Sequence, residues 1–238
     1  METLERTRKG FSFDVEEAFK SGFYLSGAPG SGKSDVAMYA IDELLKTGAI
    51  VYVLDPSQDW IERFSSIKYI VTFKNPPYTL EEIQLKSGIL DTSTLTVLQI
   101  QEVVDRFCWL LYKHQADIPK EKRRQIFLLF EEAQMAFPQG VMRAKRLQNV
   151  VRLITVGRNY KLRCGLVTQF ASTVDKDVLK SCRQRYFGWT DEKNDCAYIG
   201  SIIGMEEANT LRYQKPGEFL YNYPAKNIQE KIKIQPYH

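Results

Sequence analysis

The sequence has little of what marks several common classes of protein. It contains only two histidines, His114 and His238, and no C-x-x-C pair among its four cysteines, so neither a histidine-based metal site nor a disulfide framework is expected. No apolar run is long enough to span a membrane, and the charged segment 1–10 lacks the apolar centre of a signal peptide. We therefore expect a cytoplasmic protein without membrane insertion and with reduced thiols.

The chain as a whole has no large excess of charge of either sign. The chain has 33 basic and 29 acidic residues and a formal charge of +4, so bulk charge alone does not indicate a nucleic-acid partner. One local absence differs: residues 135–174 contain no Asp or Glu. The basic residues of this segment are Arg143, Lys145, Arg146, Arg152, Arg158, Lys161 and Arg163. Two interpretations fit it, namely a surface for a polyanion (nucleic acid or a neighbouring subunit's triphosphate) and a solvated basic face.

A glycine-rich loop is the most informative motif that is present. Residues 27–34 read GAPGSGKS and match the phosphate-binding pattern G-x-x-x-x-G-K-[ST]. An apolar segment at 22–25 precedes the loop and an amphipathic segment at 35–46 follows it, which predicts a strand and a helix. In that setting, backbone N–H groups and a helix N-terminus bind phosphate.

The loop predicts an ATP site with Mg²⁺. Lys33 is expected to reach the β- and γ-phosphates, and the Ser34 hydroxyl to ligate the metal ion. The residues expected to contact ATP are Gly27, Pro29, Gly30, Ser31, Gly32, Lys33, Ser34 and Asp35.

An apolar strand that ends in two acids supplies a second motif, IFLLFEE at 126–132. Glu131 is expected to hold the Mg²⁺ shell, and Glu132 to orient and deprotonate the attacking water. A strand followed by an acidic helix start would give the same letters, but the phosphate loop favours the catalytic interpretation. Gln169 ends another expected strand, where a polar side chain can lie near the γ-phosphate.

Apolar and amphipathic segments alternate along the chain. Strands are expected at 22–25, 49–54, 68–73, 95–100, 125–130, 163–169, 185–190, 219–221 and 228–234. Helices are expected at 35–46, 80–87, 101–115, 141–156, 175–182 and 191–203. This alternation predicts an α/β P-loop NTPase fold of the RecA/ASCE-like type, with a central, mostly parallel sheet between two layers of helices. At 238 residues we expect one domain, with an N-terminal arm at 1–21, an ATPase core at 22–214 and a C-terminal extension with late strands at 215–238.

Several motifs occur together and in order. They are the phosphate loop, LDPSQDW at 54–60, EEAQ at 131–134, VGRNY at 156–160 and LVTQFASTVDKDVLKSC at 166–182. In combination they resemble the HerA/FtsK superfamily of DNA-pumping ATPases, and the HerA branch most of all. The resemblance covers roughly residues 22–217.

The resemblance implies roles for four residues. Asp55 matches an acid that helps to organise the catalytic site, and Glu132 matches the catalytic glutamate. Arg158 matches an arginine offered to the next subunit's nucleotide, and Gln169 matches a residue that senses the γ-phosphate. Gln134 stands where many relatives have histidine, and Glu131 is the longer acid at the metal-facing position.

The beginning of the chain also differs from cellular HerA. Only about twenty residues precede the expected 22–25 strand, too few for the small β-barrel that comes before the motor in those proteins. The resemblance is therefore to a motor domain without that β-barrel, as in the packaging ATPases of DNA viruses and the ATPases of small mobile elements.

The function implied is an ATP-hydrolysing translocase that pumps double-stranded DNA as a homo-oligomeric ring, a hexamer. Its task would be viral genome packaging, in the host cytoplasm and with a capsid or nuclease partner, or transfer of mobile-element DNA. An oligomeric ATPase that acts on protein is an alternative, distinguished by turnover that DNA does not stimulate. A nucleotide-gated binding module is a second alternative, and such a module would need neither a catalytic base like Glu132 nor an arginine like Arg158. A helicase loader matches the 157–182 segment less well.

Overall fold

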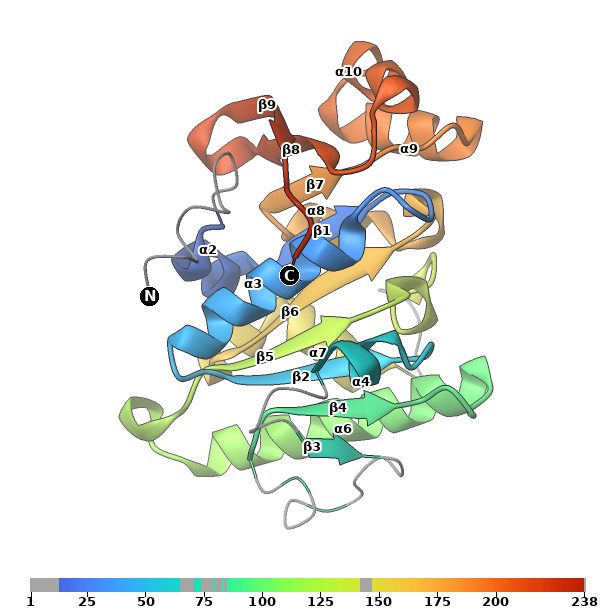
Figure 1. Ribbon diagram of the computed structural model, residues 1–238. Coiled ribbons are helices and arrows are strands. Elements are labelled where there is room, and N and C mark those ends of the chain that lie inside the picture. Colours follow the sequence, from blue (N-terminus) through green and yellow to red (C-terminus); the bar gives the residue numbers. More distant parts are fainter. Residues whose placement is uncertain are drawn as a thin grey trace.

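A central sheet organises the molecule. The computed structural model describes residues 13–64, 71–73, 79, 83, 85–141 and 147–237. Nine strands in this part form one sheet, in the order β3-β4-β2-β5-β6-β1-β7-β8-β9 (Figure 1). The strands are β1 (Phe23–Ser26), β2 (Ile50–Asp55), β3 (Val71–Phe73), β4 (Gly88–Asp91), β5 (Ile126–Phe130), β6 (Leu162–Thr168), β7 (Gln184–Phe187), β8 (Glu218–Tyr223) and β9 (Ile228–Lys233). All pairs from β3 to β7 are parallel, and β8 and β9 extend the sheet as an antiparallel hairpin.

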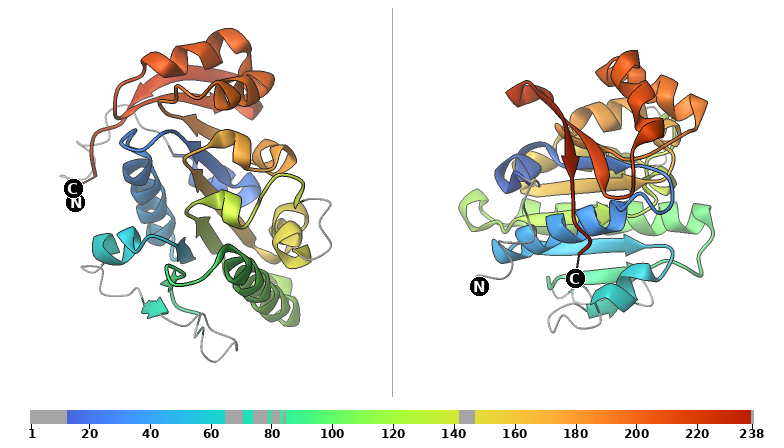
Figure 2. Two further views of the ribbon diagram at one scale, coloured as in Figure 1. Left: turned by 90° about the vertical axis from the view of Figure 1, so that its right-hand side faces the viewer. Right: turned by 45° about the horizontal axis from the view of Figure 1, so that its top comes forward.

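Helices cover both faces of the sheet (Figure 2). One face carries α2 (Val15–Ser21), α3 (Lys33–Lys46) and α4 (Asp59–Phe64). The other carries α6 (Val97–Asp117), α7 (Gln148–Thr155) and α8 (Lys176–Ser181), and α9 (Lys193–Ile203) and α10 (Met205–Thr210) pack beyond α8. Short 3-10 helices are η1 (Lys120–Lys122), η2 (Ala133–Met135), η4 (Gly157–Tyr160), η5 (Ala171–Thr173), η6 (Leu211–Tyr213) and η7 (Pro224–Lys226). The expected α/β architecture is confirmed.

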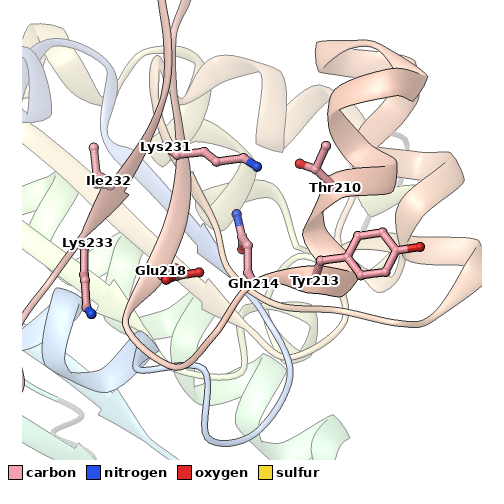
Figure 3. A pocket seen from close by; sticks show the side chains of 7 residues that line it. All are labelled: Thr210, Tyr213, Gln214, Glu218, Lys231, Ile232 and Lys233. Atoms are coloured by element: carbon pink, nitrogen blue, oxygen red, sulfur yellow. The ribbon is translucent and has the colours of Figure 1, made fainter.

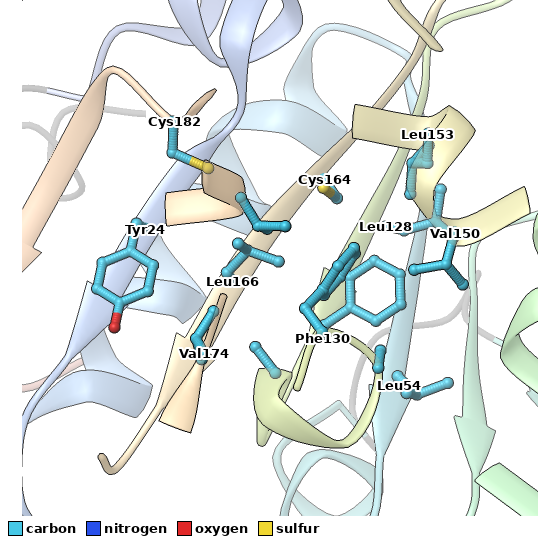
Figure 4. Close-up of a cluster of buried hydrophobic side chains, with 14 of the residues drawn as sticks. Tyr24, Leu54, Leu128, Phe130, Val150, Leu153, Cys164, Leu166, Val174 and Cys182 are labelled. Carbon is cyan, nitrogen blue, oxygen red and sulfur yellow. The ribbon is translucent and has the colours of Figure 1, made fainter. Parts of the chain in front are cut away.

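The central strands are buried on both sides, which explains their continuous apolar runs. Alternate side chains enter two cores: Tyr24, Leu128 and Leu166 face α6 to α8 (Figure 4), and Phe23 and Phe127 face the opposite layer. The rings of Phe23 and Phe127 stack at 5.6 Å between centroids. A Cβ on Gly165 of the neighbouring strand would lie only 2.4 Å from the Phe23 ring, so this pair of aromatic rings needs glycine at that position.

One expected strand is wrong. Residues 95–100 do not form a strand, because Thr96 begins α6 with a capping box: its hydroxyl accepts the Gln99 N–H and the Gln99 side chain accepts the Thr96 N–H. Helical spacing then places Ile100, Val104 and Phe107 in the core. The strand in this region is β4, which pairs with β2.

Other boundaries shift or fall outside the described residues. Half of the helix expected at 80–87 lies there, and its last residues, 85–87, are not helical. Residues 68–70 of an expected strand and 142–146 of an expected helix, whose described part is α7, also lie outside the described residues. The sequence did not predict α2, α4 or α10. Within the described residues, none of the helices combines the length and the apolar character needed to cross a bilayer.

Residues after β9 return to the N-terminal half of the chain. The Ile234 N–H donates to the Gly217 carbonyl at 2.8 Å, and the Tyr237 N–H donates to the Asp35 carboxylate at 3.0 Å. The Tyr237 ring meets the Tyr39 ring edge-on at 4.9 Å. The described end of the chain therefore packs on α3 of its own subunit.

Candidate active site

The phosphate loop joins the carboxyl end of β1 to α3 (Figure 1). Gly27, Gly30 and Gly32 have φ of +156°, +77° and +94°, a region that side chains with a Cβ avoid. A Cβ on Gly27 would also lie 2.8 Å from the Ser31 hydroxyl, whereas a Cβ on Gly30 would meet nothing within 4 Å. The loop is thus tightly folded at its start and open at Gly30, where a ligand can approach the backbone.

Backbone hydrogen bonds fix the loop to three parts of the molecule. The Gly27 N–H donates to the Thr168 carbonyl at 3.3 Å, and the Ala28 N–H to the Trp189 carbonyl at 2.7 Å. The Ser31 carbonyl accepts the Gly217 N–H at 2.9 Å. The loop is therefore held by the end of β6, the segment after β7 and the turn before β8.

Lys33 and Ser31 fit a phosphate ligand. The Lys33 ammonium is buried and donates to the Ala28 carbonyl at 3.1 Å. Burial lowers the pKa of Lys33, and the charges of Glu131 and Glu132 oppose that shift. The Ser31 hydroxyl is buried without a hydrogen-bond partner among the described residues. A bound phosphate would supply negative charge to the ammonium and acceptors to the donors, so the loop suits the ATP predicted from its sequence.

The two acids follow β5, which only β6 separates from β1 and its phosphate loop in the sheet order. Burial and the neighbouring charge of Glu132 raise the pKa of Glu131 to about 7, although Lys33 and the hydrogen bond from Trp60 act in the opposite direction. The Trp60 indole N–H donates to Glu131 Oε2 at 3.2 Å. Glu131 is therefore a half-buried carboxyl that a divalent cation near Ser34 would keep ionised.

Asp55 supports this arrangement from the end of β2. Its side chain is fully buried and accepts the N–H groups of Ser57, Trp60 and Ile61 at 3.1, 2.9 and 3.3 Å. These bonds fold the turn after β2 and begin α4, which carries Trp60 to Glu131. Burial raises the pKa of Asp55, and the hydrogen bonds from the turn oppose that effect.

Glu132 is held by two amide side chains. Gln169 Nε2 donates to Glu132 Oε1 at 2.5 Å, and Gln134 Nε2 donates to Glu132 Oε2 at 2.7 Å. Thr168 in turn donates its hydroxyl to Gln134 Oε1 at 2.9 Å, which fixes the orientation of that amide. Glu132 itself has φ of +51°, a conformation that costs about 1 kcal/mol or more for a residue with a Cβ. The fold thus holds this carboxylate at one place beside the loop.

Arg158 lies at the amino ends of the parallel strands, which we call the amino edge, and the phosphate loop lies at their carboxyl ends, which we call the loop edge. Arg158 is exposed on η4, which precedes β6, whereas the phosphate loop follows β1. Because β1 and β6 are parallel and Ser26 pairs with Thr168, the seven residues of β6 separate the two edges by roughly 20 Å. The structure therefore groups Lys33, Glu131, Glu132 and Gln169, and it leaves Arg158 apart from them.

A basic cavity of about 290 Å³, which we call the amino-edge pocket, surrounds Arg158. Lys20, Arg163 and Arg183 also line it, and no acid does. Other basic residues of the segment have internal partners: Arg152 covers the Tyr112 ring at 3.8 Å, and Lys161 donates to the Arg123 carbonyl. Arg143, Lys145 and Arg146 lie outside the described residues.

Comparison with known structures relates this geometry to solved proteins. No protein-family model and no curated protein matches the sequence. The genome-packaging NTPase B204 of Sulfolobus turreted icosahedral virus 2 superposes with a TM-score of 0.70 at 18% identity, over 91% of this chain and 97% of B204. VirB4 of Thermoanaerobacter pseudethanolicus superposes with a TM-score of 0.67 at 11% identity, over 90% of this chain and 89% of VirB4.

A third neighbour is the pCW3 conjugation coupling protein TcpA, at a TM-score of 0.53 and 15% identity, over 93% of this chain and 62% of TcpA. The chain shares its fold with these three proteins. The fold expected from its motifs is confirmed. B204 has also been solved with the nucleotide analogue AMPPCP, so a neighbour of this fold binds a nucleotide.

Sequence reasoning missed the residues that support the acids. Trp60 lies in the turn motif at 54–60, yet its contact with Glu131 joins residues 71 positions apart. Thr168 precedes Gln169 in the sequence, but only the folded chain shows that it orients Gln134. Gly217, which joins the turn before β8 to the phosphate loop, carried no sequence signal.

Proposed function

We propose that the chain is an Mg²⁺-dependent ATPase that moves double-stranded DNA, and that it works as a homo-oligomeric ring, a hexamer. The observation that carries the ATPase part is the carboxylate of Glu132, which Gln134 and Gln169 hold beside the phosphate loop. A protein that only bound nucleotide would need no carboxylate fixed in this way. The neighbours named for genome packaging and conjugation support the DNA part.

Each residue of the loop edge has one task in the reaction. Backbone N–H groups of residues 30–34 and the Lys33 ammonium bind the phosphates, and Ser34 and Glu131 hold Mg²⁺. The bound metal neutralises charge on the phosphate oxygens. Glu132 orients the attacking water and accepts its proton at a carboxylate oxygen. Gln169 donates to Glu132, and in this proposal its amide also senses the γ-phosphate, which would link the state of the nucleotide to the position of the base.

Arg158 completes the site from a neighbouring subunit. It is exposed and lies at the sheet edge opposite its own phosphate loop, so it cannot serve that loop without unfolding β6. A head-to-tail contact between two copies brings the amino edge of one against the loop edge of the next, and such contacts close into rings. The arginine then stabilises the charge that develops on the γ-phosphoryl oxygens.

DNA is the polyanion that the ring encloses in this proposal. Basic residues of segment 135–174 are the first candidates for phosphate contacts, and Arg152, although it covers the Tyr112 ring, is exposed outside the proposed subunit contact. Contacts of this kind release counterions, so DNA affinity should fall steeply as the salt concentration rises.

The test is ATP hydrolysis by the purified protein with and without double-stranded DNA, at about 50 and 200 mM salt. We expect DNA to stimulate turnover at the lower salt concentration and to lose that effect at the higher one. Turnover that DNA does not stimulate at either salt concentration would contradict the translocase and favour an ATPase that acts on protein. Tight ATP binding without turnover under any condition would contradict the ATPase and favour a nucleotide-gated binding module.

A further inference from the structure

Aromatic and basic side chains gather on the exposed side of α6. The ring of Trp109 contacts two cations: Arg106 Cζ lies 4.3 Å from the ring centroid, and Lys113 Nζ lies 5.4 Å from it. The three residues share one face of the helix, because they stand at positions i, i+3 and i+7. Glu102 precedes Arg106 by four residues, a spacing that favours an ion pair, yet these two described residues form none. Arg106 covers the indole ring instead.

A second part of this cluster lies where α6 meets α7 and η4 (Figure 2). The rings of Tyr112 and Tyr160 lie 4.2 Å apart between centroids. Arg152 Cζ lies 3.8 Å from the centroid of the Tyr112 ring, and Arg123 Cζ lies 4.8 Å from that of Tyr160. We call these four cations, with the three rings that they cover, the cation–aromatic face.

The positive charges of the cation–aromatic face are not neutralised within the part of the chain that the structure describes. None of the ion pairs there involves one of its four cations. The carboxylate of Asp105, next to this face in the sequence, accepts the N–H groups of Asn149 and Val150 at 2.8 and 3.0 Å, where it begins α7. Contact with an aromatic ring orders a cation without cancelling its charge, so the face presents a positive potential to solvent.

This arrangement fits phosphates better than bases. Proteins that bind single-stranded nucleic acid offer open aromatic rings on which bases stack, whereas here a cation of the chain itself occupies a face of each ring. Arg106, Lys113 and Arg152 are exposed and can donate to phosphate oxygens. From Arg106 to Lys113 the helix rises about 10 Å, a length over which a duplex carries about six phosphate charges.

We propose that the cation–aromatic face binds the backbone of double-stranded DNA, with Arg106, Lys113 and Arg152 as the phosphate contacts. Trp109 and Tyr112 support the cations and do not themselves contact bases. The inference rests on the proposed function and adds to it a surface of contact. It assigns DNA to the α6 side of the sheet and leaves Arg158, at the amino edge, to the nucleotide of a neighbouring subunit.

Fluorescence anisotropy with a labelled duplex tests the face. The full chain is titrated at a series of salt concentrations, as wild type and with Arg106→Gln, Lys113→Gln and Arg152→Gln combined. We expect the triple variant to bind at least about tenfold more weakly at about 50 mM salt. The slope of log affinity against log salt should become shallower by about 2 to 3, because three phosphate contacts are lost.

A matched control removes the same amount of charge elsewhere. It combines Lys215→Gln, Lys231→Gln and Lys233→Gln, all at exposed positions. Figure 3 shows Lys231 and Lys233 on β9, beside a cavity of about 350 Å³. β9 is the last strand of the sheet, whereas α6 follows β4 near the other end. The control variant should keep the wild-type affinity and salt dependence.

A measurement on the wild-type chain needs no substitution. Acetylation of exposed lysines is followed by mass spectrometry with and without the duplex. Lys113 should react severalfold more slowly when DNA is bound, and Lys231 should react at the same rate in both samples.

The outcomes separate the face from the function. Equal losses of affinity in the two triple variants, or a Lys113 that DNA does not protect, would overturn the cation–aromatic face while DNA binding stands. The second result would favour an acidic protein as the partner of this face. A wild-type chain that binds no duplex at any salt concentration would overturn the DNA function and the face together.

Discussion

The two edges of the sheet differ in how their charged groups are held. At the loop edge, Lys33, Glu131 and Glu132 are fixed by hydrogen bonds from Trp60, Gln134 and Gln169 or to the loop backbone. At the amino edge, Arg158 is exposed, and it lines a pocket with three further basic side chains. One edge holds its charged groups around the place of a small ligand. At the other edge Lys20 and Arg183 pair with Glu16 and Glu17, and Arg163 donates to backbone carbonyls, whereas Arg158 is exposed. The proposed role of Arg158 at a neighbouring subunit's site rests on this exposure.

The largest effect should come from the base at the loop edge. Glu132→Gln removes the proton acceptor and keeps the shape of the side chain, so we expect turnover to fall at least about 1,000-fold with ATP affinity unchanged. Steady-state hydrolysis and calorimetric titration measure the two quantities. Glu121→Gln, the same change at an exposed position on η1, should have no effect, and unchanged turnover in Glu132→Gln would remove Glu132 from the mechanism.

The next effect concerns the opposite edge. Arg158→Ala should lower turnover about 100-fold or more, because the charge that develops on the γ-phosphoryl oxygens loses its neutralising partner. ATP binding by the unassembled chain should not change, since Arg158 lies far from its own loop. Arg124→Ala, at an exposed arginine that precedes β5 at the same edge, serves as the control. If both substitutions lower turnover equally, the role belongs to general charge and not to Arg158.

A smaller effect should follow at the group that orients the base. Gln134→Ala leaves one oxygen of Glu132 without its donor, and we expect turnover to fall about tenfold, as is usual for residues that orient a catalytic group. Gln134→His, which keeps an N–H donor, should retain more activity than Gln134→Ala. Equal activities in hydrolysis assays of the two variants would show that the hydrogen bond to Glu132 has no catalytic role.

A further effect is on stability and depends on pH. Burial raises the pKa of Glu131 to about 7 in the fold, from about 4.3 in an unfolded chain. The folded state therefore binds the extra proton, so this residue costs nothing below pH 4.3 and reduces stability progressively up to pH 7. Thermal unfolding without ligand should show Glu131→Gln more stable than the wild type at pH 8, by roughly 4 kcal/mol at most, and equally stable at pH 4. A gain of the same size at both pH values would contradict the shifted pKa.

The fold was predictable wherever a segment carried its own signal. The phosphate loop, the apolar β5 with its two acids, and β6 could be found because motif, burial and chain order agree at each of them. The strand predicted at 95–100 was wrong because an apolar run resembles a strand unless Thr96 and Gln99 are recognised as a helix cap. The sequence did not predict β4, because its four residues form a strand only through pairing with β2 and β3.

The site divides in the same way. Lys33, Ser34, Glu131 and Glu132 follow from spacing along the chain, since their chemistry needs those residue types at those positions. The contacts from Trp60 to Glu131, from Thr168 to Gln134 and from Gly217 to Ser31 join distant segments. No local pattern encodes them, because they arise from the order of strands in the sheet.

The account's central claim is that the two edges supply halves of one site from different subunits, and mixing two inactive variants tests it most directly. Glu132→Gln retains Arg158 and lacks the base, and Arg158→Ala has the reverse composition. Combined in equal amounts, they form interfaces in which an intact base faces an intact arginine, so ATP turnover should rise well above the sum of the separate activities. A mixture no more active than that sum would show that each subunit does not complete its neighbour's site.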